Sequence, residues 1–530
     1  MILSVENYSL SYRTAAGLAP ALVDVSLDIA KGEVLGLVGE SGSGKSSLAW
    51  AIMRHMPRNA VEAGGALRLG GTDLRGLDAR GIAAVRGKRI GMVFQDPSTA
   101  LNPTLRLGDQ VIEVLMRQRG LSRAEARDTA EEALREVELR EPAALMRRFP
   151  HEASGGEKQR VVIATAFATR PELILFDEPT TALDVITGAR ILELFARLRA
   201  RTGVSALYIS HDLALVSRVA DRVAVLKRGV VVEQGTPDAV FRAPQHPYTR
   251  QLVAAVPRPG HRLVRDEAAR GTVLAANGIS VRYARRRLFR PAPPPATHAV
   301  SLAVKPGEIF GVVGESGSGK SSLARALSGL ASFDGGIEAV GQRIAHARDM
   351  GRDYRRAVQI VFQHPDSSLN PRMRIGAILA RPLRLYGGSD AEIPRLLEEV
   401  RLPRDYAAKY PHQLSGGEKQ RVAIARAFAA RPSLVICDEI TAALDVSVQA
   451  QVVELLLELR RQHGTAYLFI THDLNLIRQI AHRIAVMRNG EMVDLRDAAA
   501  IGGDDAHPYT RALIAASPVP VGEALPEHNA

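Results

Sequence analysis

Short apolar runs alternate with helical patterns in each half of the chain. In the first half the strand-like runs are Ile2–Val5, Leu22–Ile29, Val34–Val38, Ile90–Phe94, Leu173–Phe176 and Ala206–Ile209. The later runs are apolar almost throughout, as expected for strands covered on both faces. Strands that alternate with helices predict an α/β domain with a parallel-sheet core. Residues from Ser98 to Thr169 follow a helical period instead, which predicts an inserted helical subdomain.

A capping box marks the start of one helix in this subdomain. In Ser122-Arg-Ala-Glu125, the serine and the glutamate can each satisfy the other's backbone N–H group. The apolar face of the predicted helix is formed by Ala126, Ala130, Leu134 and Val137. The second half repeats the box at Ser389–Glu392, but Pro394 follows closely and predicts a later helix start.

The second half of the chain repeats the first at steady offsets. Lys45 and Lys320 are 320 − 45 = 275 positions apart, and Gln95 and Gln363 are 363 − 95 = 268 apart. The offset is 261 for Ser154 and Ser415, for Asp177 and Asp438, and for His211 and His472. Such offsets predict two domains of one fold rather than a short-period solenoid. We expect domains at 1–256 and 272–517, a linker at 257–271 and a disordered tail at 518–530.

Composition and charge bound the class of protein. Hydrophobic residues make up 46% of the 530 residues, enough for packed cores, and the net charge is 69 − 57 = +12. Such basicity suits nucleic acid, an anionic membrane face or nucleotide, but charge alone favours an arginine-rich solvated surface. We interpret the basic, proline-rich segment Arg285–Pro295 in the same way, as a solvated loop rather than a nucleic-acid site.

Cysteine usage and hydropathy exclude further classes. Cys437 is the only cysteine, so we expect no internal disulfide, no Cys-ligated zinc and no iron–sulfur cluster. We interpret it as a small buried strand residue. The chain lacks an apolar run of about 18 residues that could span a bilayer, and its start lacks the regions of a signal peptide. We expect a protein of the reducing cytoplasm, soluble or held at a membrane by partners.

Two near-copies of one glycine-rich stretch carry the first candidate chemistry. VLGLVGESGSGKSSL (34–48) and IFGVVGESGSGKSSL (309–323) both match G-x-x-x-x-G-K-[ST]. The glycines let backbone N–H groups approach a phosphate, the helix N-terminus favours negative charge, the lysine adds a point charge and the serine can bind Mg²⁺. Two long copies in one chain indicate two sites for a nucleotide phosphate.

An acidic pair at a later strand end completes each candidate site. Asp177-Glu178 and Asp438-Glu439 each follow an apolar strand. The aspartate can hold Mg²⁺ while the glutamate polarises an attacking water. A lone Asp-Glu pair is as often an ordinary strand end, but here both pairs occur downstream of a phosphate loop. The sequence therefore predicts two phosphoryl-transfer sites.

A further motif identifies the family that the chain resembles. Ser154-Gly155-Gly156-Glu157-Lys158-Gln159-Arg160 and Leu414-Ser415-Gly416-Gly417-Glu418-Lys419-Gln420-Arg421 are similar to the signature motif of ABC-type ATPases. The resemblance covers nearly the whole chain, in two copies. It implies two tandem P-loop NTPase domains of ABC type. Each would have a parallel-sheet core, an antiparallel β subdomain and an inserted helical subdomain.

The resemblance also implies a role for each matching residue. Tyr12 and Tyr283 match the aromatic that stacks on adenine, and Gln95 and Gln363 match the glutamine that senses Mg²⁺ and contacts the transporter. The catalytic residues would be Glu178 and Glu439, with His211 and His472 contacting the γ-phosphate. The other implied ATP ligands are Gly39, Ser41, Gly42, Gly44, Lys45, Ser46, Ser47, Gly314, Ser316, Gly317, Gly319, Lys320, Ser321 and Ser322, with signature residues Ser154, Gly155, Gly156, Ser415, Gly416 and Gly417. The implied Mg²⁺ ligands are Ser46, Gln95, Asp177, Ser321, Gln363 and Asp438.

In this family the signature of one domain closes over the nucleotide held by the other. The resemblance therefore implies two shared ATP sites within one chain. The sequence departs from the family pattern at Ala153, where leucine is usual, and at Ile440, where proline usually follows the glutamate. Both Ser-Gly-Gly cores and both glutamates are present, so we expect both sites to hydrolyse ATP with at most modest asymmetry.

A narrower resemblance lies outside the nucleotide motifs. His246-Pro-Tyr-Thr-Arg250 recurs as His507-Pro-Tyr-Thr-Arg511 at the end of each domain. With the proline-rich segments after Gln95 and Gln363, this is similar to the importer ATPases of the peptide, opine and nickel uptake group. Many members carry a cysteine-rich iron–sulfur site in this extension, which this sequence lacks. Locally, the motif is equally compatible with a packing turn.

This second resemblance implies the partners and the location. Fused two-domain members serve peptide and glutathione uptake. The implied function is to energise import of peptides or related solutes through two membrane permease subunits, with an extracytoplasmic solute-binding protein and without nucleic acid. The chain would lie on the cytoplasmic face of the inner membrane of a prokaryote. The alternatives are a soluble tandem ATPase that acts on ribosomes, which usually has a long charged linker, and an exporter ATPase.

Overall fold

The computed structural model describes residues 1–15, 17–181, 183–258, 260–264, 266, 268–283, 294–442 and 444–518. Within these ranges the chain divides into two units, with the boundary between Val256 and Pro257. Most of the predicted basic loop at 285–295 and nearly all of the predicted tail at 518–530 lie outside the described residues.

In the first unit the strands are β1 (Leu3–Thr14), β2 (Gly17–Ile29), β3 (Val34–Val38), β4 (Ala60–Leu69), β5 (Thr72–Asp73), β6 (Ile90–Val93), β7 (Leu173–Asp177), β8 (Ser205–Ile209), β9 (Arg222–Lys227) and β10 (Val230–Gly235). The helices are α1 (Lys45–Ile52), α2 (Ala79–Val85), α3 (Pro97–Ala100), α4 (Leu107–Arg119), α5 (Arg123–Glu136), α6 (Pro142–Leu145), α7 (Gly155–Ala168), α8 (Val185–Thr202), α9 (Leu213–Val219), α10 (Pro237–Arg242) and α11 (Pro247–Ala255).

The second unit repeats this order. Its strands are β11 (Leu274–Val281), β12 (Thr297–Val304), β13 (Ile309–Val313), β14 (Asp334–Ala339), β15 (Gln342–Ile344), β16 (Val358–Val361), β17 (Leu434–Asp438), β18 (Ala466–Ile470), β19 (Arg483–Arg488) and β20 (Glu491–Asp497). Its helices are α12 (Lys320–Leu327), α13 (Arg352–Ala357), α14 (Pro365–Ser368), α15 (Ile375–Leu385), α16 (Ile393–Glu399), α17 (Gly416–Phe428), α18 (Val446–His463), α19 (Leu474–Ile480) and α20 (Pro508–Ala516).

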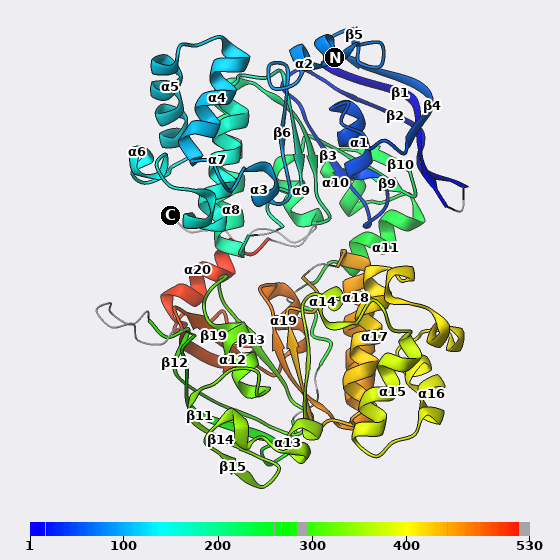
Figure 1. The fold of residues 1–530 in the computed structure, drawn as a ribbon, viewed down its shortest axis with the longest axis vertical. Helices are drawn as coiled ribbons and strands as arrows, with labels where there is room; N and C mark the ends of the chain where they lie inside the picture. Colours follow the sequence, from blue (N-terminus) through cyan, green and yellow to red (C-terminus); the bar gives the residue numbers. More distant parts are fainter. Residues whose placement is uncertain are drawn as a thin grey trace. The chain divides into compact units, whose positions relative to one another are not determined.

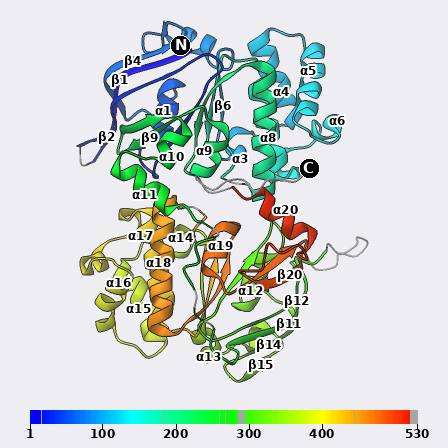
Figure 2. The ribbon, with the colours of Figure 1, turned by 180° about the vertical axis from the view of Figure 1, so that it is seen from behind.

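Each unit contains two sheets, visible from opposite sides in Figures 1 and 2. The core sheet has the order β10-β9-β3-β8-β7-β6 in the first unit and β20-β19-β13-β18-β17-β16 in the second. Its strands pair in parallel except at the edge, where β9–β10 and β19–β20 are antiparallel. The smaller sheets, β2-β1-β4-β5 and β12-β11-β14-β15, are antiparallel. The predicted fold, with its parallel core, antiparallel β subdomain and helical subdomain, is confirmed.

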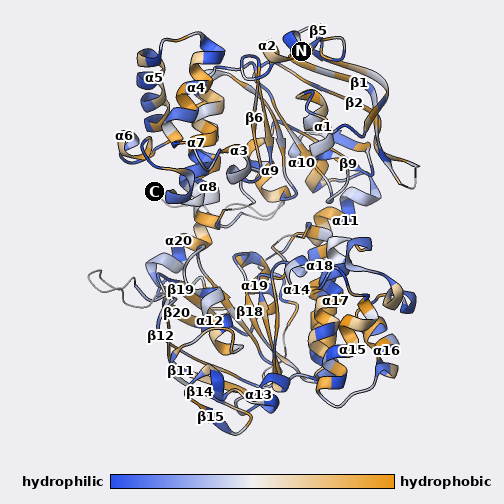
Figure 3. Ribbon diagram, viewed as in Figure 1, coloured by the Kyte–Doolittle hydropathy of each residue, from blue (hydrophilic) through white to orange (hydrophobic). Residues whose placement is uncertain are grey.

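Alternate residues of the core strands face two different hydrophobic clusters. In β3, Val34 and Val38 pack into a cluster with the helices that include α4, α5, α7 and α8, whereas Leu35 and Leu37 pack into a cluster with α1 and the antiparallel sheet. Figure 3 shows the apolar colour concentrated along these strands and the inward faces of the helices. The phosphate-loop helix α1 and the signature helix α7 therefore cover opposite faces of one sheet.

Local sequence signals explain several boundaries. The Ser122–Glu125 capping box forms at the start of α5, and Ala126, Ala130 and Leu134 are fully buried. In the second unit a 3₁₀ turn at Asp390–Glu392 precedes α16, whose first turn contains Pro394, so the predicted later start is confirmed. The strands β1 and β2 extend beyond the predicted runs 2–5 and 22–29 and pair as far as Thr14 and Gly17. The sequence did not predict these ends, because their residues are exposed and lack an alternating apolar pattern.

The described part of the predicted linker packs on the second unit. Val264 is buried, and the Leu263 N–H donates to the Gln479 carbonyl at 2.9 Å. The buried Arg460 guanidinium pairs with Asp266 and lies 3.4 Å from His482. The first unit instead pairs the corresponding Arg199 with its own Asp221, which stands at the position of His482. The linker segment thus supplies a carboxylate that the first unit has in its own fold.

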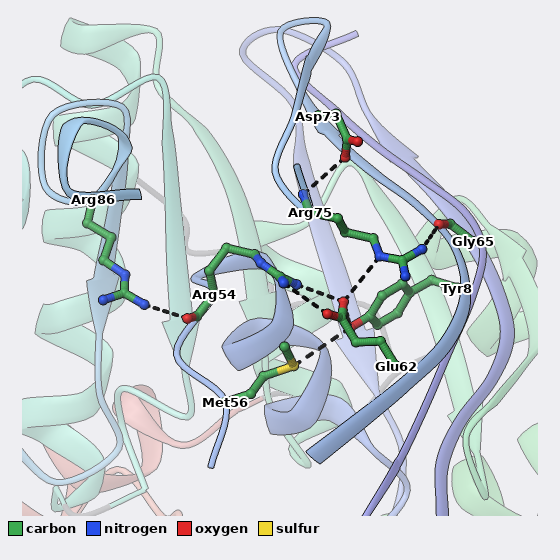
Figure 4. A network of polar contacts seen from close by, with 8 residues as sticks. All are labelled: Tyr8, Arg54, Met56, Glu62, Gly65, Asp73, Arg75 and Arg86. Atoms are coloured by element: carbon green, nitrogen blue, oxygen red, sulfur yellow. Dashed lines mark hydrogen bonds and ion pairs between the residues drawn. The ribbon is translucent and has the colours of Figure 1, made fainter. Parts of the chain in front are cut away.

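A network of polar contacts ties α1 to the antiparallel sheet in the first unit (Figure 4). Glu62 on β4 accepts two hydrogen bonds from Arg54, at 2.7 and 2.9 Å, and one from the Tyr8 hydroxyl at 2.8 Å. Arg75 lies 3.4 Å from the same carboxylate. Arg86 in turn donates to the Met53 carbonyl at 2.8 Å. These contacts hold the end of the phosphate-loop helix against β1 and β4.

The second unit replaces this network with small and apolar residues. Arg54 lies two positions after α1, and Gly329 lies two positions after α12. Tyr8 pairs with Val25 across the sheet, whereas its counterpart Ile279 pairs with Val300. The carbonyl at the end of α12, on Leu327, instead accepts a hydrogen bond from the buried Tyr354 hydroxyl. The same junction is therefore polar in the first unit and mainly apolar in the second.

None of the helices among the described residues has the length and hydrophobicity needed to cross a membrane.

We predict that Glu62→Gln destabilises the first unit by about 1–3 kcal/mol, because the partly buried Arg54 loses a charged partner. Trp50, the only tryptophan, lies on α1, so its fluorescence during urea unfolding reports on this unit. Glu6→Gln is the matched control, because the Glu6–Arg68 pair on the same sheet is exposed. Equal unfolding midpoints for Glu62→Gln and Glu6→Gln would contradict the prediction.

Candidate functional site

Each phosphate loop joins a core strand to the helix that follows it. Gly39 comes directly after β3 with φ 151°, and a Cβ atom there would lie 2.2 Å from the Leu226 carbonyl oxygen. Gly314 repeats this geometry with φ 154° and a distance of 2.2 Å to the Met487 carbonyl oxygen. Only glycine fits both the dihedral angle and the space. The remaining predicted loop residues, Ser41, Gly42, Gly44, Ser316, Gly317 and Gly319, complete the two turns.

The lysine of each loop is buried and held by backbone carbonyls. The Lys45 ammonium donates to the Gly39 and Glu40 carbonyl oxygens at 2.7 and 2.9 Å. Lys320 donates to the corresponding carbonyls of Gly314 and Glu315, both at 2.8 Å. These bonds turn the lysine back into its own loop, where its charge lies beside the N-terminus of α1 or α12. Both features favour an anion at this position.

A serine and an aspartate meet beside each lysine. The Ser46 hydroxyl donates to Asp177 Oδ1 at 3.0 Å, and the Ser321 hydroxyl donates to Asp438 Oδ1 at 2.9 Å. Burial raises the pKa of both aspartates. A hydroxyl and a carboxylate are hard oxygen donors of the kind Mg²⁺ prefers. The two pairs therefore fit the predicted metal role.

The predicted catalytic glutamates lie next to these pairs in an uncommon backbone conformation. Glu178 has φ 49° and Glu439 has φ 50°, the left-handed region that side chains rarely adopt. Such strain is found at functional sites when the surrounding structure enforces it. Here the Glu178 and Glu439 N–H groups donate to the Ile209 and Ile470 carbonyls of the neighbouring strands, both at 3.0 Å.

Each glutamate gathers the other predicted side chains around one carboxylate oxygen. Glu178 Oε2 lies 3.1 Å from each of Gln95 Nε2, Thr181 Oγ1 and His211 Nδ1. Glu439 Oε2 lies 3.2 Å from Gln363 Nε2 and 3.7 Å from His472 Nδ1. The two glutamines thus contact the glutamates through their amide nitrogen, and their predicted role as Mg²⁺ ligands stays a prediction.

Charge is balanced within each of these clusters. Burial alone would raise the pKa of Glu178, but the hydrogen bond and charge of His211, with the charge of Lys45, lower it below its ordinary value. Burial alone would lower the pKa of His211, but the hydrogen bond and charge of Glu178 raise it. Glu439 and His472 shift in the same directions for the same reasons. The glutamates are therefore ionised at neutral pH and able to accept a proton.

The predicted adenine tyrosines lie beside the first turn of each loop helix. The Tyr12 hydroxyl donates to Ser47 at 3.0 Å, and the Tyr283 hydroxyl donates to Ser322 at 3.2 Å. Tyr12 is part of β1 and partly buried, whereas Tyr283 follows the end of β11 and is 59% exposed. The second ring is therefore not a core residue, and its setting differs from that of the first.

The signature residues do not join the cluster of their own unit. Ser154 caps α7 by accepting the Glu157 N–H, and Ser415 caps α17 by accepting the Glu418 N–H. Both serines are exposed, as are the first signature glycines Gly155 and Gly416. The second glycines, Gly156 and Gly417, are tightly packed: an added Cβ would lie 2.8 Å from Thr187 and 2.5 Å from Val448, respectively. Each signature thus presents an exposed helix N-terminus, and in the first unit its helix α7 packs on the face of the sheet opposite α1.

Two kinds of contact were not predicted from the sequence. Thr181 binds Glu178 in the first unit, and Ala442 stands at the corresponding position of the second. Tyr248 and Tyr509, from the repeated His-Pro-Tyr-Thr motif, accept N–H groups of the two phosphate loops. The signal available for the tyrosines was their repetition at the offset of 261, which marked a family but not a contact.

Comparison with known proteins places this geometry in a family. The profile of ABC transporters matches residues 22–181 and 297–442, more than half of the chain. The chain belongs to the ABC transporter family. A second profile, the C-terminal region of oligopeptide/dipeptide transporters, matches residues 232–291 and includes the first His-Pro-Tyr-Thr motif. Both resemblances drawn from the motifs are confirmed.

Several relatives align over nearly the whole chain. The peptidoglycan transport ATP-binding protein YejF of Agrobacterium fabrum (strain C58) is 42% identical, over 97% of this chain and 96% of its own length. The glutathione import ATP-binding protein GsiA of Escherichia coli (strain K12) is 39% identical, over 98% and 90%. GsiA of Salmonella typhimurium (strain LT2) is 40% identical over the same shares. All three names describe ATP-binding proteins of transport systems.

We predict that Glu178→Gln lowers the pKa of His211 below about 6.5, because burial then acts without the opposing carboxylate. In the unchanged protein His211 stays protonated as the pH rises past 6.5 and loses its proton only at its raised pKa. Histidine NMR titration in buffer free of nucleotide and Mg²⁺ measures both values. Glu172→Gln, which removes the exposed partner of Arg89, is the control and leaves the His211 pKa unchanged. An unchanged His211 titration in Glu178→Gln would contradict the assignment.

Proposed function

We propose that this ABC protein is the ATP-hydrolysing subunit of an importer for peptides or related small solutes. One observation carries the proposal: a buried lysine, a Ser–Asp pair and a Glu–His pair occur together in both units. Two findings support import rather than export. The chain shares a C-terminal region with oligopeptide/dipeptide transporters, and the GsiA relatives are named for an import system.

The side chains divide the work of hydrolysis. Lys45 or Lys320 and the loop N–H groups bind the phosphates, with Tyr12 or Tyr283 placed to stack on adenine. Ser46 with Asp177, or Ser321 with Asp438, would hold Mg²⁺, which neutralises phosphate charge when bound. Gln95 and Gln363 orient the glutamates and complete the predicted metal ligands.

Glu178 and Glu439 act on the attacking water. Each carboxylate, ionised at neutral pH, accepts a hydrogen bond from a water molecule and draws away its proton. The water oxygen bonds to the γ-phosphorus while the bond to the bridging oxygen breaks, and ADP leaves with that oxygen and its electron pair. His211 and His472 hold the glutamates through Nδ1 and are placed to contact the γ-phosphate.

The two units together would form two shared sites. One site combines the first loop with Ser415, Gly416 and Gly417, and the other combines the second loop with Ser154, Gly155 and Gly156. Two features support this pairing: each signature is an exposed helix N-terminus with N–H groups suited to a phosphate, and in the first unit the signature helix packs on the opposite face of the sheet from the loop helix. ATP would then favour the closed arrangement and hydrolysis would release it.

Coupling to transport requires partners. We expect two membrane permease subunits and an extracytoplasmic solute-binding protein, and a position on the cytoplasmic face of the inner membrane of a prokaryote. A tandem ATPase that acts on ribosomes, or an exporter ATPase, would share both ATP sites. The His-Pro-Tyr-Thr extensions and the transport systems named for the relatives favour the importer.

We predict that Glu178→Gln and Glu439→Gln each reduce ATP turnover to half or less, because each removes the base of one site. The double variant should lose about 10²–10⁴-fold, the usual contribution of a general base. Steady-state phosphate release measures all three, with Glu172→Gln as control. If either single variant keeps the full rate, the claim of two active sites is wrong.

The transport claim has its own test. Deletion of the gene should abolish uptake of labelled peptides or glutathione, and the unchanged gene should restore it while the double glutamate variant should not. Unchanged uptake after deletion, with ATPase activity intact in the purified chain, would contradict the importer and leave the ATPase assignment standing.

A further inference from the structure

The tyrosine of each His-Pro-Tyr-Thr motif reaches the phosphate loop of its own unit. Tyr248, at the start of α11, is only 3% exposed, and its hydroxyl accepts the Glu40 N–H at 3.0 Å. Tyr509, at the start of α20, is 5% exposed and accepts the Glu315 N–H at 3.1 Å. The C-terminal region therefore contacts the phosphate loop through a tyrosine hydroxyl in each unit.

Each tyrosine shares a peptide group with the loop lysine. The Glu40 N–H belongs to the same peptide plane as the Gly39 carbonyl, which accepts the Lys45 ammonium at 2.7 Å. The tyrosine and the lysine thus hold opposite ends of one planar group. Tyr509 and Lys320 hold the Gly314–Glu315 peptide in the same way. Hydrogen bonds in such a chain polarise and strengthen one another.

This peptide is one that needs external support. Gly39 and Gly314 have φ near 150°, a region open to glycine, and glycine restricts the rotation of the following peptide less than any other residue. A rotated peptide would withdraw the carbonyl from the lysine. The tyrosine hydroxyl opposes that rotation by fixing the N–H end.

Equivalent contacts hold each tyrosine in place, although some of the residues that make them differ between the two units. Glu233 accepts the His246 N–H at 3.1 Å in the first unit, and Asp494 accepts the His507 N–H at 2.9 Å in the second. The histidines then cap their helices by accepting the Tyr248 and Tyr509 N–H groups, at 3.2 and 3.1 Å.

A cation also lies over each tyrosine ring. The Lys227 ammonium lies 4.6 Å from the centroid of the Tyr248 ring, and the Arg488 guanidinium lies 4.8 Å from that of Tyr509. Each tyrosine thus keeps a carboxylate and a cation around it, although the residue types of both change between the units. A turn that served only for packing would not need these polar contacts.

We infer that Tyr248 and Tyr509 are positioning residues of the two phosphate loops: they fix the Gly–Glu peptide that holds the loop lysine, so that phosphate binding depends on the C-terminal region. The inference rests on the proposed ATPase function for its consequence.

The test measures MgATP binding to the full chain with one loop silenced. In a Lys320→Ala background only the first loop binds strongly, and Tyr248→Phe removes one hydroxyl there. Loss of one hydrogen bond predicts MgATP affinity roughly three- to tenfold weaker. Adenosine, which lacks phosphates, should compete for the site equally well before and after the change. Tyr509→Phe in a Lys45→Ala background repeats the test in the second unit.

Tyr467→Phe in the Lys45→Ala background is the matched control for Tyr509→Phe, because it removes a buried tyrosine hydroxyl of the second unit that donates to the Leu456 carbonyl and not to the loop. It should leave MgATP affinity unchanged. Trp50 fluorescence during urea unfolding checks that the first unit is folded. Unchanged MgATP affinity in both Tyr248→Phe and Tyr509→Phe would overturn the inference. An equal loss of affinity for MgATP and for adenosine would also overturn it. A wild-type chain that binds no MgATP would instead contradict the proposed function.

Discussion

A buried ammonium group is the constraint on which each unit depends. Removing a charge from water is costly unless other polar groups surround it, and Lys45 and Lys320 are 6% and 4% exposed. The loop carbonyls hold each lysine, and the glycines give those carbonyls their direction. The ionised glutamate lies near enough for the lysine charge to lower its pKa. The tyrosine of the C-terminal region then holds the peptide behind the lysine.

The two units meet this constraint with different surroundings. The first has a polar network behind α1 and a threonine on its glutamate, where the second has Gly329 and Ala442. Tyr12 lies within a strand, whereas Tyr283 follows one. The contacts of the lysine, the Ser–Asp pair and the Glu–His pair recur in both units, whereas the residues that pack behind them differ. Such differences permit unequal nucleotide affinity at two sites that share one mechanism.

The sequence predicted the fold and the site where a local pattern carried the information. Continuous apolar runs located the core strands, and the motifs located the loops, acidic pairs and histidines that the structure brings together in each unit. The hairpin ends of β1 and β2 escaped prediction because their residues are exposed and do not alternate between apolar and polar. Asp266 resembled a solvated linker residue, yet it pairs with the buried Arg460. The Tyr248 contact joins residues 208 positions apart, so only the packing of α11 reveals it.

One chain contains two nucleotide sites, each centred on one buried lysine. The most direct test is the number of MgATP molecules bound per chain when hydrolysis is blocked by Glu178→Gln and Glu439→Gln together. Equilibrium dialysis at saturating MgATP should give two bound molecules per chain, falling to one when either lysine is replaced by alanine. A value of one in the double glutamate variant, with both loops intact, would contradict the account.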